Sequence, residues 1–363
     1  MPPEPRADRC PGVLRPHEAA DGAMVRVRVP GGQTTGTALR DLGRLAQTYG
    51  SGLLQLTSRG SLQVRGLPAA VPEPFEDAVG RAGFLPSSTH ERVRNVVASP
   101  LTGLVGGRAD LRPLVARLDE ALLAEPRLAD LPGRFLFVLD DGRGDVEGMG
   151  GDLGYRALDA GRGELIVGER RRVRPVRLVE VADTLVSLAL TFLERRTEEW
   201  HVRQLPEPLV LGTETALPDA PSPTPTGVVK EHLVVDVPLG LLSPVQVDAV
   251  HAAVGGGPVV VTPWRSLVLP DAAPARRDLA SVGLVTEPDN AWSLVSACVG
   301  SPWCGNGRAD TQGLAASLVR AGGPGGRTHL SGCERRCGAP VGQHVDLVAP
   351  TRVDIAELVL ARA

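Results

Sequence analysis

The pattern of apolar and polar positions near the N-terminus predicts a strand, a helix and a hairpin, in that order. Over residues 24–29 three valines alternate with other side chains, so Arg26 and Arg28 are expected on one face of a β-strand. A Pro-Gly-Gly sequence ends that strand. Residues 37–49 then repeat leucines at helical spacing, and residues 53–64 are typical of two short strands around a turn.

The same order of elements returns in the second half of the chain. Residues 233–269 contain an apolar strand, a helical stretch and a second apolar strand run. The turn sequence TSRGSL of the first copy aligns with TPWRSL of the second. A long internal repeat predicts two related units that bury a face against each other.

The segment between the copies predicts a further unit. Its pattern indicates a helix near 110–125, strands at 134–139 and 163–168, and a long helix near 178–198. The Pro/Thr-rich stretch 217–227 is typical of a connector between the two halves.

Composition and charge narrow the class of protein. The chain has 363 residues, 42% apolar and 22% charged, so a globular protein with two or more packed units is expected. No run approaches the ~18 apolar residues of a membrane span, and the N-terminus has no secretory apolar segment, so we expect a cytoplasmic protein. The net charge of −3 indicates no general attraction to nucleic acid or membrane. Lys230 is the only lysine, so any cationic pocket consists of arginines.

Four of the five cysteines form two short pairs. Five residues separate Cys298 from Cys304, and three separate Cys333 from Cys337. Four thiolates complete a [4Fe–4S] cluster, and the five-residue gap favours that cluster over structural zinc, which usually takes closer pairs. Zinc and buried reduced thiols are the alternatives. Cys10 stands apart and is interpreted as a structural or surface thiol.

Only the second half of the chain has these thiols. The two repeat copies are followed by comparable segments, RNVVASPLTG and LVSACVGSPWCG. Aligning their Ser-Pro dipeptides puts Val96 opposite Cys298 and Thr102 opposite Cys304. One cluster, in the C-terminal lobe, is therefore predicted.

Several of these motifs resemble those of the sirohaem-dependent nitrite and sulfite reductases and their relative, the precorrin-3B synthase family. They are RVRVPGG, LTSRGSLQVRG, VRNVVASP and the spacing of the cysteines. The resemblance covers most of the chain and implies an α+β fold with a pseudo-twofold nitrite/sulfite reductase-like architecture. In it, two ferredoxin-like half-domains are flanked by two α/β lobes with a tetrapyrrole between them, and the four cysteines bind [4Fe–4S].

The expected boundaries follow from the repeat and the resemblance together. They are a first half-domain at 1–75, a lobe without a cluster at 76–205, a linker at 206–227, a second half-domain at 228–285 and the [4Fe–4S] lobe at 286–363.

Three features favour the precorrin-3B synthase branch. The chain is compact and its segment THLSGCERRCGAP is similar to that branch, as is the N-terminal CPGVL. In the reductases two cationic or polar side chains after a Leu-Pro pair bind the small anion. The matching positions here are Arg134 and Leu136. Leucine cannot hydrogen-bond nitrite or sulfite, which argues against reduction of an inorganic anion.

The resemblance implies an oxygen-dependent conversion of precorrin-3A, an octacarboxylate tetrapyrrole, to precorrin-3B in aerobic cobalamin biosynthesis. Such a monooxygenase hydroxylates C20 with lactone formation, using O2 and electrons from NADH. No dinucleotide-binding glycine fingerprint is present, so electrons are expected either from a separate electron-donor reductase or from NADH at a site that the sequence does not reveal. The family is also associated with a mononuclear non-haem iron. No 2-His-1-carboxylate set stands out, so the catalytic residues stay unassigned.

Seven residues match motif positions that contact the macrocycle, its axial ligand or the small anion in this superfamily: Arg26, Arg28, Thr57, Arg59, Gln63, Arg94 and Arg134. Arginine binds carboxylates at two points, which suits a substrate with eight acid arms. For each arginine the alternative is a solvated surface side chain. His329 and His344 are candidate proton donors or iron ligands, with hydrogen-bonded structural histidines as the alternative.

Two other functions stay open. One is a short sirohaem-dependent nitrite or sulfite reductase, which would bind sirohaem. The other is a non-enzymatic electron-transfer iron–sulfur protein, against which binding of a precorrin-like octacarboxylate would argue.

Overall fold

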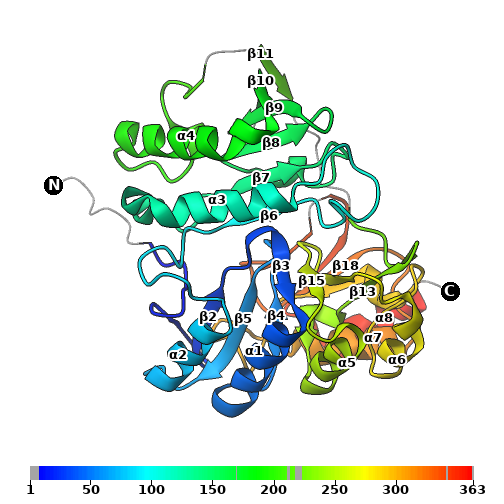
Figure 1. The fold of residues 1–363 in the computed structure, drawn as a ribbon. Coiled ribbons are helices and arrows are strands. Elements are labelled where there is room, and N and C mark those ends of the chain that lie inside the picture. The colour runs from blue at the N-terminus through cyan, green and yellow to red at the C-terminus, as the bar shows by residue number, and fades with distance from the viewer. Residues whose placement is uncertain (1–7, 169, 211–212, 217–222, 341, 362–363) are drawn as a thin grey trace.

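The computed structural model describes residues 8–168, 170–210, 213–216, 223–340 and 342–361. Within them the chain forms four β-sheets with helices packed on them (Figure 1). Two sheets belong to the repeat copies and two to the lobes that follow them. This mixture of helices with parallel and antiparallel sheets confirms the predicted α+β class.

The first repeat copy forms an antiparallel sheet in the order β1-β2-β5-β4-β14. Its strands are β1 (His17–Ala19), β2 (Gly22–Val27), β4 (Leu54–Leu56), β5 (Leu62–Leu67) and β14 (Leu241–Leu242). Helices α1 (Gly36–Tyr49) and α2 (Glu73–Arg81) contribute to the same core. The predicted order of strand, helix and hairpin is confirmed.

The second copy forms a matching sheet in the order β12-β13-β16-β15-β3. Its strands are β12 (Gly227–Val229), β13 (His232–Asp236), β16 (Ser266–Leu269), β15 (Pro258–Val261) and β3 (Gln33–Thr35). Its helices are α5 (Pro244–Val254) and α6 (Arg276–Ser281).

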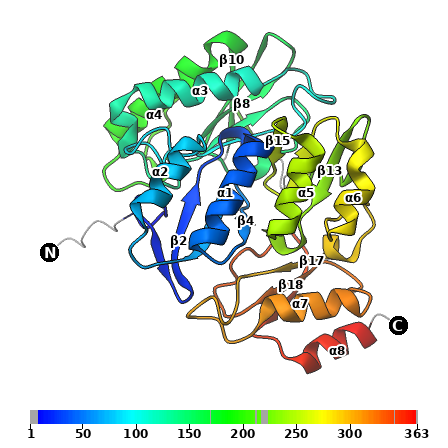
Figure 2. The same cartoon turned by 60° about the horizontal axis from the view of Figure 1, so that its bottom comes forward.

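Each of these two sheets ends in a strand from the other copy. Thr34 of β3 lies opposite Val259 of β15, and Leu242 of β14 lies opposite Leu54 of β4. Helices α1 and α5 run side by side, so both copies bury their apolar faces in one continuous core (Figure 2). The boundaries predicted at 1–75 and 228–285 contain most of the two copies, but the boundary at 75 falls within α2, and strand exchange makes the copies a single packed unit.

The first lobe contains a six-stranded sheet in the order β11-β10-β9-β8-β7-β6, with two helices. Strands β6, β7 and β8 are parallel, and the rest pair antiparallel. The elements are β6 (Val96–Ala98), α3 (Arg112–Ala124), β7 (Phe137–Asp140), β8 (Leu153–Ala157), β9 (Arg162–Val167), β10 (Arg170–Arg177), α4 (Val181–Arg195) and β11 (Thr213–Ala216).

The two predicted helices correspond to α3 and α4, and the two predicted strands to β7 and β9, to within a few residues at each end. Strands β6, β8 and β10 were not predicted. Strand β11 lies inside the stretch expected to be a linker and pairs with β10. Residues 217–222 of that stretch lie outside the described residues, as do the side chains of Arg170 to Arg174.

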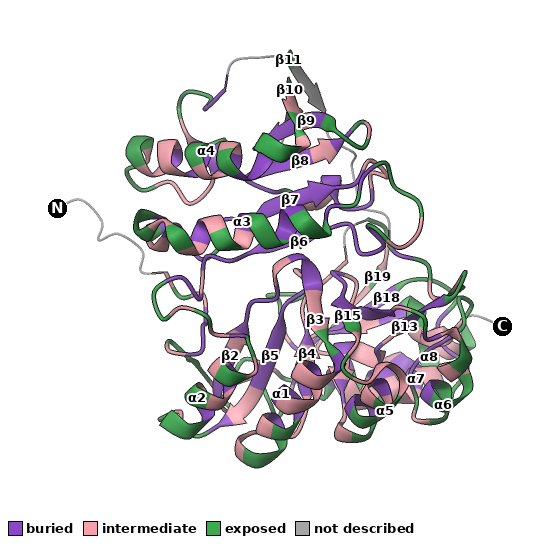
Figure 3. Ribbon diagram, viewed as in Figure 1, coloured by how far each residue is buried: buried purple, intermediate pink, exposed green. Residues whose placement is uncertain are grey.

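The C-terminal lobe is a smaller parallel sheet, β17-β18-β19, covered by α7 (Thr311–Arg320) and α8 (Arg352–Leu360). Its strands are β17 (Val295–Ala297), β18 (Thr328–Ser331) and β19 (Val345–Val348). The paired half-domains lie between the two lobes (Figure 2). Strands are mostly buried and the outer faces of the helices are exposed (Figure 3). None of the helices among the described residues is long and apolar enough to cross a bilayer.

Candidate metal centre and substrate cavity

The four paired cysteines converge at one edge of the C-terminal sheet. Cys298 follows β17 directly, and Cys304 lies in the loop between β17 and α7. Cys333 and Cys337 lie in the loop after β18. Because β17 and β18 are parallel neighbours, their carboxyl ends and the loops that follow them meet at the same edge.

The other three thiols lie near enough to Cys337 to influence its ionisation. Burial, and then the neighbouring Cys298, Cys333 and Cys304, raise the pKa of the Cys337 thiol. Among the described residues, no three of these sulfur atoms lie within 4.8 Å of one another. Such a spacing is wider than that of thiolates around a single tetrahedral zinc ion.

The loop backbone also fits a group held by sulfur. The N–H of Gly332 donates to Sγ of Cys298 at 3.1 Å, which is the kind of contact that stabilises a thiolate ligand. A Cβ at Gly332 would lie 3.1 Å from Cα of Gly307 and 3.2 Å from Cα of Gly300. The two cysteine loops therefore approach each other as closely as glycine permits. An all-thiolate donor set in such a cradle suits an iron–sulfur cluster.

The first lobe carries the same loop without sulfur. The N–H of Asp141 donates to Oγ of Ser99 at 3.1 Å, as Gly332 donates to Cys298. Ser99 follows β6 directly, just as Cys298 follows β17, so these two residues are the true counterparts. The alignment on Ser-Pro dipeptides, which put Val96 opposite Cys298, is wrong by three residues because the two Ser-Pro pairs lie at different distances from their strands. The first lobe still offers a hydroxyl where the second offers a thiol.

A cavity of about 720 Å³ lies beside the cysteine loops. The two repeat turns contribute Arg59, Trp264 and Arg265 to its wall. Leu136 of the first lobe and Gly338, next to Cys337, lie on other sides of it. The cavity thus touches both half-domains and both lobes, which is where the resemblance implies a tetrapyrrole.

Arg26 and Arg28 lie together near the N-terminal segment. Arg28 is 2% exposed, and its Nη1 donates to the carbonyl of Pro11 at 3.2 Å. Its Nε and Nη2 have no partner among the described residues. Burial, and then the charge of Arg26, lower the pKa of Arg28 to about 9. A carboxylate would satisfy both unpaired donors at once.

Gln63 holds Arg26 in place across the sheet. The two residues are register partners on β2 and β5. With the Gln63 amide oriented to suit its neighbours, its oxygen accepts from Nε and Nη2 of Arg26 at 2.9 and 2.6 Å. The same orientation lets its nitrogen donate to Oε1 of Gln55 at 3.1 Å. Gln63 therefore orients an arginine.

Arg59 is the one residue of the predicted seven that lines the cavity. Its Nη1 donates to the carbonyl of Arg134 at 3.0 Å, and burial lowers its pKa. Oγ1 of Thr57 accepts from the N–H of Ser61 at 3.1 Å, so Thr57 shapes the turn that carries Arg59. The side chain of Arg134 is exposed.

Arg94 is placed differently from the other arginines. Its Nε and Nη2 bind the two carboxylate oxygens of Asp119 on α3 at 2.7 and 2.6 Å. Arg94 is 5% exposed, so this pair ties the start of β6 to α3 from inside the lobe. The geometry favours a structural ion pair over a substrate contact.

Histidines flank the cysteine loops. His329 is fully buried on β18, and its Nδ1 lies 2.8 Å from Oγ of Ser296. Burial, and then the charge of Arg265, lower the pKa of His329 to about 4. Nδ1 of His344 donates to the carbonyl of Gly342 at 2.9 Å. These contacts fit structural histidines, and no carboxylate joins the pair to form an iron site among the described residues.

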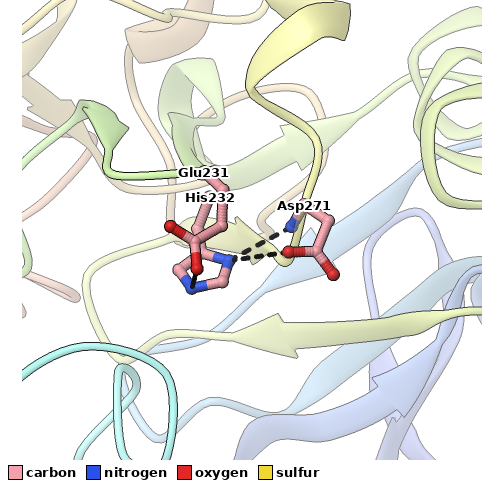
Figure 4. A group of neighbouring side chains, drawn as sticks. All are labelled: Glu231, His232 and Asp271. Atoms are coloured by element: carbon pink, nitrogen blue, oxygen red, sulfur yellow. Dashed lines mark hydrogen bonds and ion pairs between the residues drawn. The ribbon is translucent and has the colours of Figure 1, made fainter.

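Two other groups of potential ligands have structural explanations. His232 lies between Glu231 and Asp271, with Nε2 3.6 Å and Nδ1 3.5 Å from their carboxylates (Figure 4). Its Nδ1 accepts the N–H of Asp271 at 3.1 Å, so the ring joins two loops at the end of β13 away from the cavity.

The second group, Asp140, Asp141 and Asp145, is buried in the first lobe. Asp140 accepts the N–H groups of Gly142 and Gly144 at 2.8 and 2.9 Å, and Asp141 pairs with Arg143 at 2.6 Å. These contacts show that the group stabilises the loop that follows β7.

Sequence reasoning did not identify Trp264 and Arg265 as part of the cavity. The signal was present in the aligned turns, where Trp264 stands opposite Arg59 and Arg265 opposite Gly60. Weak residue identity between the copies concealed it.

This geometry defines a class of protein with a pseudo-twofold sulfite-reductase-like fold and a four-cysteine site. Residues 15–81 match the family model described as the nitrite/sulfite reductase ferredoxin-like half domain. The solved structure of Mycobacterium tuberculosis NirA superposes with a TM-score of 0.67 at 20% identity, covering 86% of this chain and 68% of that one. The nitrite/sulfite reductase-like fold is therefore confirmed.

Within that class the chain is similar to precorrin-3B synthase. It is 26% identical to the precorrin-3B synthase of a Sinorhizobium species, over 94% of this chain and 81% of that protein. It is 25% identical to a sulfite reductase (ferredoxin) of Mycolicibacterium paratuberculosis, over 82% of this chain but 62% of that protein. The predicted resemblance to precorrin-3B synthase, of the nitrite/sulfite reductase superfamily, is confirmed.

Proposed function

We propose that this chain is an oxidoreductase of the precorrin-3B synthase type, which converts precorrin-3A to precorrin-3B by oxygen-dependent hydroxylation at C20 with lactone formation. The observation that carries the proposal is Leu136 in the cavity wall. Leu136 is 2% exposed and belongs to an apolar cluster with Val97 and Val138, against which Trp264 packs. This apolar part of the wall offers no hydrogen bond at the position where the reductases bind the small anion, and it suits the face of a macrocycle.

The reaction balances with one O2 and one NADH for each substrate. One oxygen atom enters the product as the C20 hydroxyl, and the other leaves as water with two electrons from NADH and two protons. Because no NADH site is evident in the sequence, we infer that a separate reductase delivers the electrons.

Cys298, Cys304, Cys333 and Cys337 are proposed to hold a [4Fe–4S] cluster, which would supply single-electron transfer at the edge of the cavity. Arg28 and Arg59 are proposed to bind acid arms of the substrate. Support comes from the two unpaired donors of Arg28 and from the position of Arg59 in the cavity wall. Arg26 adds positive charge next to Arg28.

The second candidate is a sirohaem-dependent nitrite or sulfite reductase, favoured by the fold shared with NirA. An electron-transfer protein without a substrate is the third, but it leaves the buried charge of Arg28 without a role.

Anaerobic purification separates these functions. The proposal expects about four irons with matching sulfide per chain, a broad visible absorption and no sirohaem bands. It also expects incorporation of one labelled oxygen atom from O2 into precorrin-3A when NADH and a reductase are supplied. Stoichiometric sirohaem together with reduction of nitrite or sulfite would replace this proposal with the second candidate.

A further inference from the structure

Arg265 has a backbone conformation that, at the equivalent position of the first repeat copy, is adopted by a glycine. Its φ is +62°, and φ of its counterpart Gly60 is +63°. The two turns share their hydrogen bonds, because the N–H of Thr262 donates to the carbonyl of Ser266 at 2.9 Å and that of Thr57 donates to the carbonyl of Ser61 at 3.0 Å. A side chain in this left-handed conformation is unfavourable, so its presence calls for a reason.

The side chain of Arg265 runs through a groove formed by two glycines. A Cβ at Gly240 would lie 2.8 Å from Cδ of Arg265, and one at Gly338 would lie 2.7 Å from its Nη2. Gly338 directly follows Cys337. The guanidinium therefore lies against the loop that carries the fourth cysteine.

The charge of Arg265 has no counter-charge within the described residues. No ion pair or side-chain hydrogen bond of its guanidinium is found in that part of the chain, and no neighbouring charge contributes to the shift of its pKa. Burial lowers the pKa of Arg265, and its charge is felt by His329. The group lines the cavity together with Arg59. A partly buried, unpaired cation facing a cavity is unfavourable unless an anion joins it.

A second residue of the cavity wall also stands where the first half-domain has a glycine. Leu239 has φ of +56° where its counterpart Gly31 has φ of +60°, and Leu239 also lines the cavity. Four residues of the second half-domain other than glycine have positive φ, and two of them, Leu239 and Arg265, face the cavity; the other two, Lys230 and Asp271, do not line it. Leu239 and Arg265 are the two that stand where the first half-domain has a glycine in the same conformation, which is consistent with a binding surface.

We propose that Arg265 binds one carboxylate of the substrate and so positions an acid arm of the macrocycle beside the cysteine loops. The inference rests on the proposed function, since it requires an organic polycarboxylate as substrate. It adds a contact from the second half-domain to those proposed for Arg28 and Arg59 of the first, so the substrate would be held from both repeat copies.

The test compares binding and stability in the full, cluster-loaded chain. The probe is sirohydrochlorin, a metal-free octacarboxylate tetrapyrrole, titrated by absorption and fluorescence. Arg265→Gly removes the charge and restores the residue found in the counterpart turn. We expect its Kd to rise at least about tenfold while its midpoint of urea unfolding stays equal or increases. Arg265→Lys keeps the charge without the two-point geometry, so its Kd is expected to lie between those of the parent chain and Arg265→Gly.

Arg277→Gln is the matched control, because Arg277 is an exposed arginine of the same half-domain, on α6. Its Kd is expected to equal that of the parent chain. Equal Kd values for the parent chain and Arg265→Gly would overturn the inference while leaving the proposed function intact. Failure of the parent chain to bind the probe at all would overturn the proposed function itself, and the inference with it.

Discussion

At the scale of single residues, the four paired cysteines are chemically distinct from the fifth. Cys337→Ser is expected to remove most of the bound iron and the visible absorption, because a serine hydroxyl is a much poorer ligand for iron–sulfur clusters than a thiolate. Cys10→Ser is the control, since Cys10 lies beside Asp8 and Gly133 instead of the cysteine loops. Iron and sulfide analysis of both variants checks this. Full retention of iron in Cys337→Ser would contradict the assignment.

Asp145 gives the protein a dependence of stability on pH. Burial raises the pKa of Asp145 from 3.8 to about 7, against the hydrogen bond that Oγ of Ser99 donates to it at 2.6 Å. The folded chain therefore holds a proton between about pH 4 and pH 7 that the unfolded chain releases. The free energy of unfolding should fall as the pH rises through that window and then level off.

Asp145→Asn is expected to remove this loss and to raise the free energy of unfolding at pH 8 by about 1–3 kcal/mol. The amide oxygen can still accept from Ser99. Urea unfolding at pH 5 and pH 8 measures the effect, with Asp289→Asn as an exposed control. An equal pH dependence in Asp145→Asn and the parent chain would show that Asp145 is not responsible.

Arg94 is expected to affect stability and not substrate binding, in contrast to the arginines proposed to bind the substrate. Arg94→Gln leaves the carboxylate of Asp119 without its two-point partner and is expected to lower the free energy of unfolding by about 2–4 kcal/mol. The affinity for sirohydrochlorin should stay unchanged. A loss of affinity without a loss of stability would instead return Arg94 to the substrate site.

At the scale of elements, the strand exchange depends on close approach of two backbones. Gly32 directly precedes β3, has φ of +70°, and a Cβ there would lie only 2.0 Å from the carbonyl oxygen of Val261 on β15. Gly32→Ala should therefore lower the free energy of unfolding by about 3 kcal/mol or more. Gly52 has φ of +83° with open space around it, so Gly52→Ala should cost only about 1 kcal/mol. Similar losses in the two variants would indicate that β3 can move away from β15.

The elements themselves were largely predictable, because their periodicity is local. Leu39 and Leu42 are fully buried on α1, as their helical spacing requires, and Val25 and Val27 are buried on β2. Strand β3 was not predicted. Its partner is β15, more than two hundred residues away, and three residues carry too little pattern to reveal it.

At the scale of the whole molecule, the shared core makes the repeat copies depend on each other. A fragment of residues 8–91 lacks β14 and the α5 side of the core, so we expect no cooperative urea unfolding from it. Joining it to residues 223–285 through a flexible linker should restore a cooperative transition. Circular dichroism during urea titration measures both. A cooperative transition in the short fragment alone would show that each copy folds independently.

The sequence by itself determined the class of the fold, the repeat and the cysteine group. Those features depend on periodicity and on ligand spacing, both of which are written along the chain. The thiols of Cys298 and Cys304 lie in one loop and those of Cys333 and Cys337 in another, and the pair spacings alone pointed to one metal centre.

Only the tertiary structure decided which arginines face a substrate. Arg94 and Arg59 look alike as motif residues, yet one is paired with Asp119 and the other lines the cavity. Ser99 is recognisable as the counterpart of Cys298 only from the matching hydrogen bonds of the two loops. Partners such as these are chosen by packing between distant segments, and the energy of a buried charge depends on what lies around it, which no local pattern records.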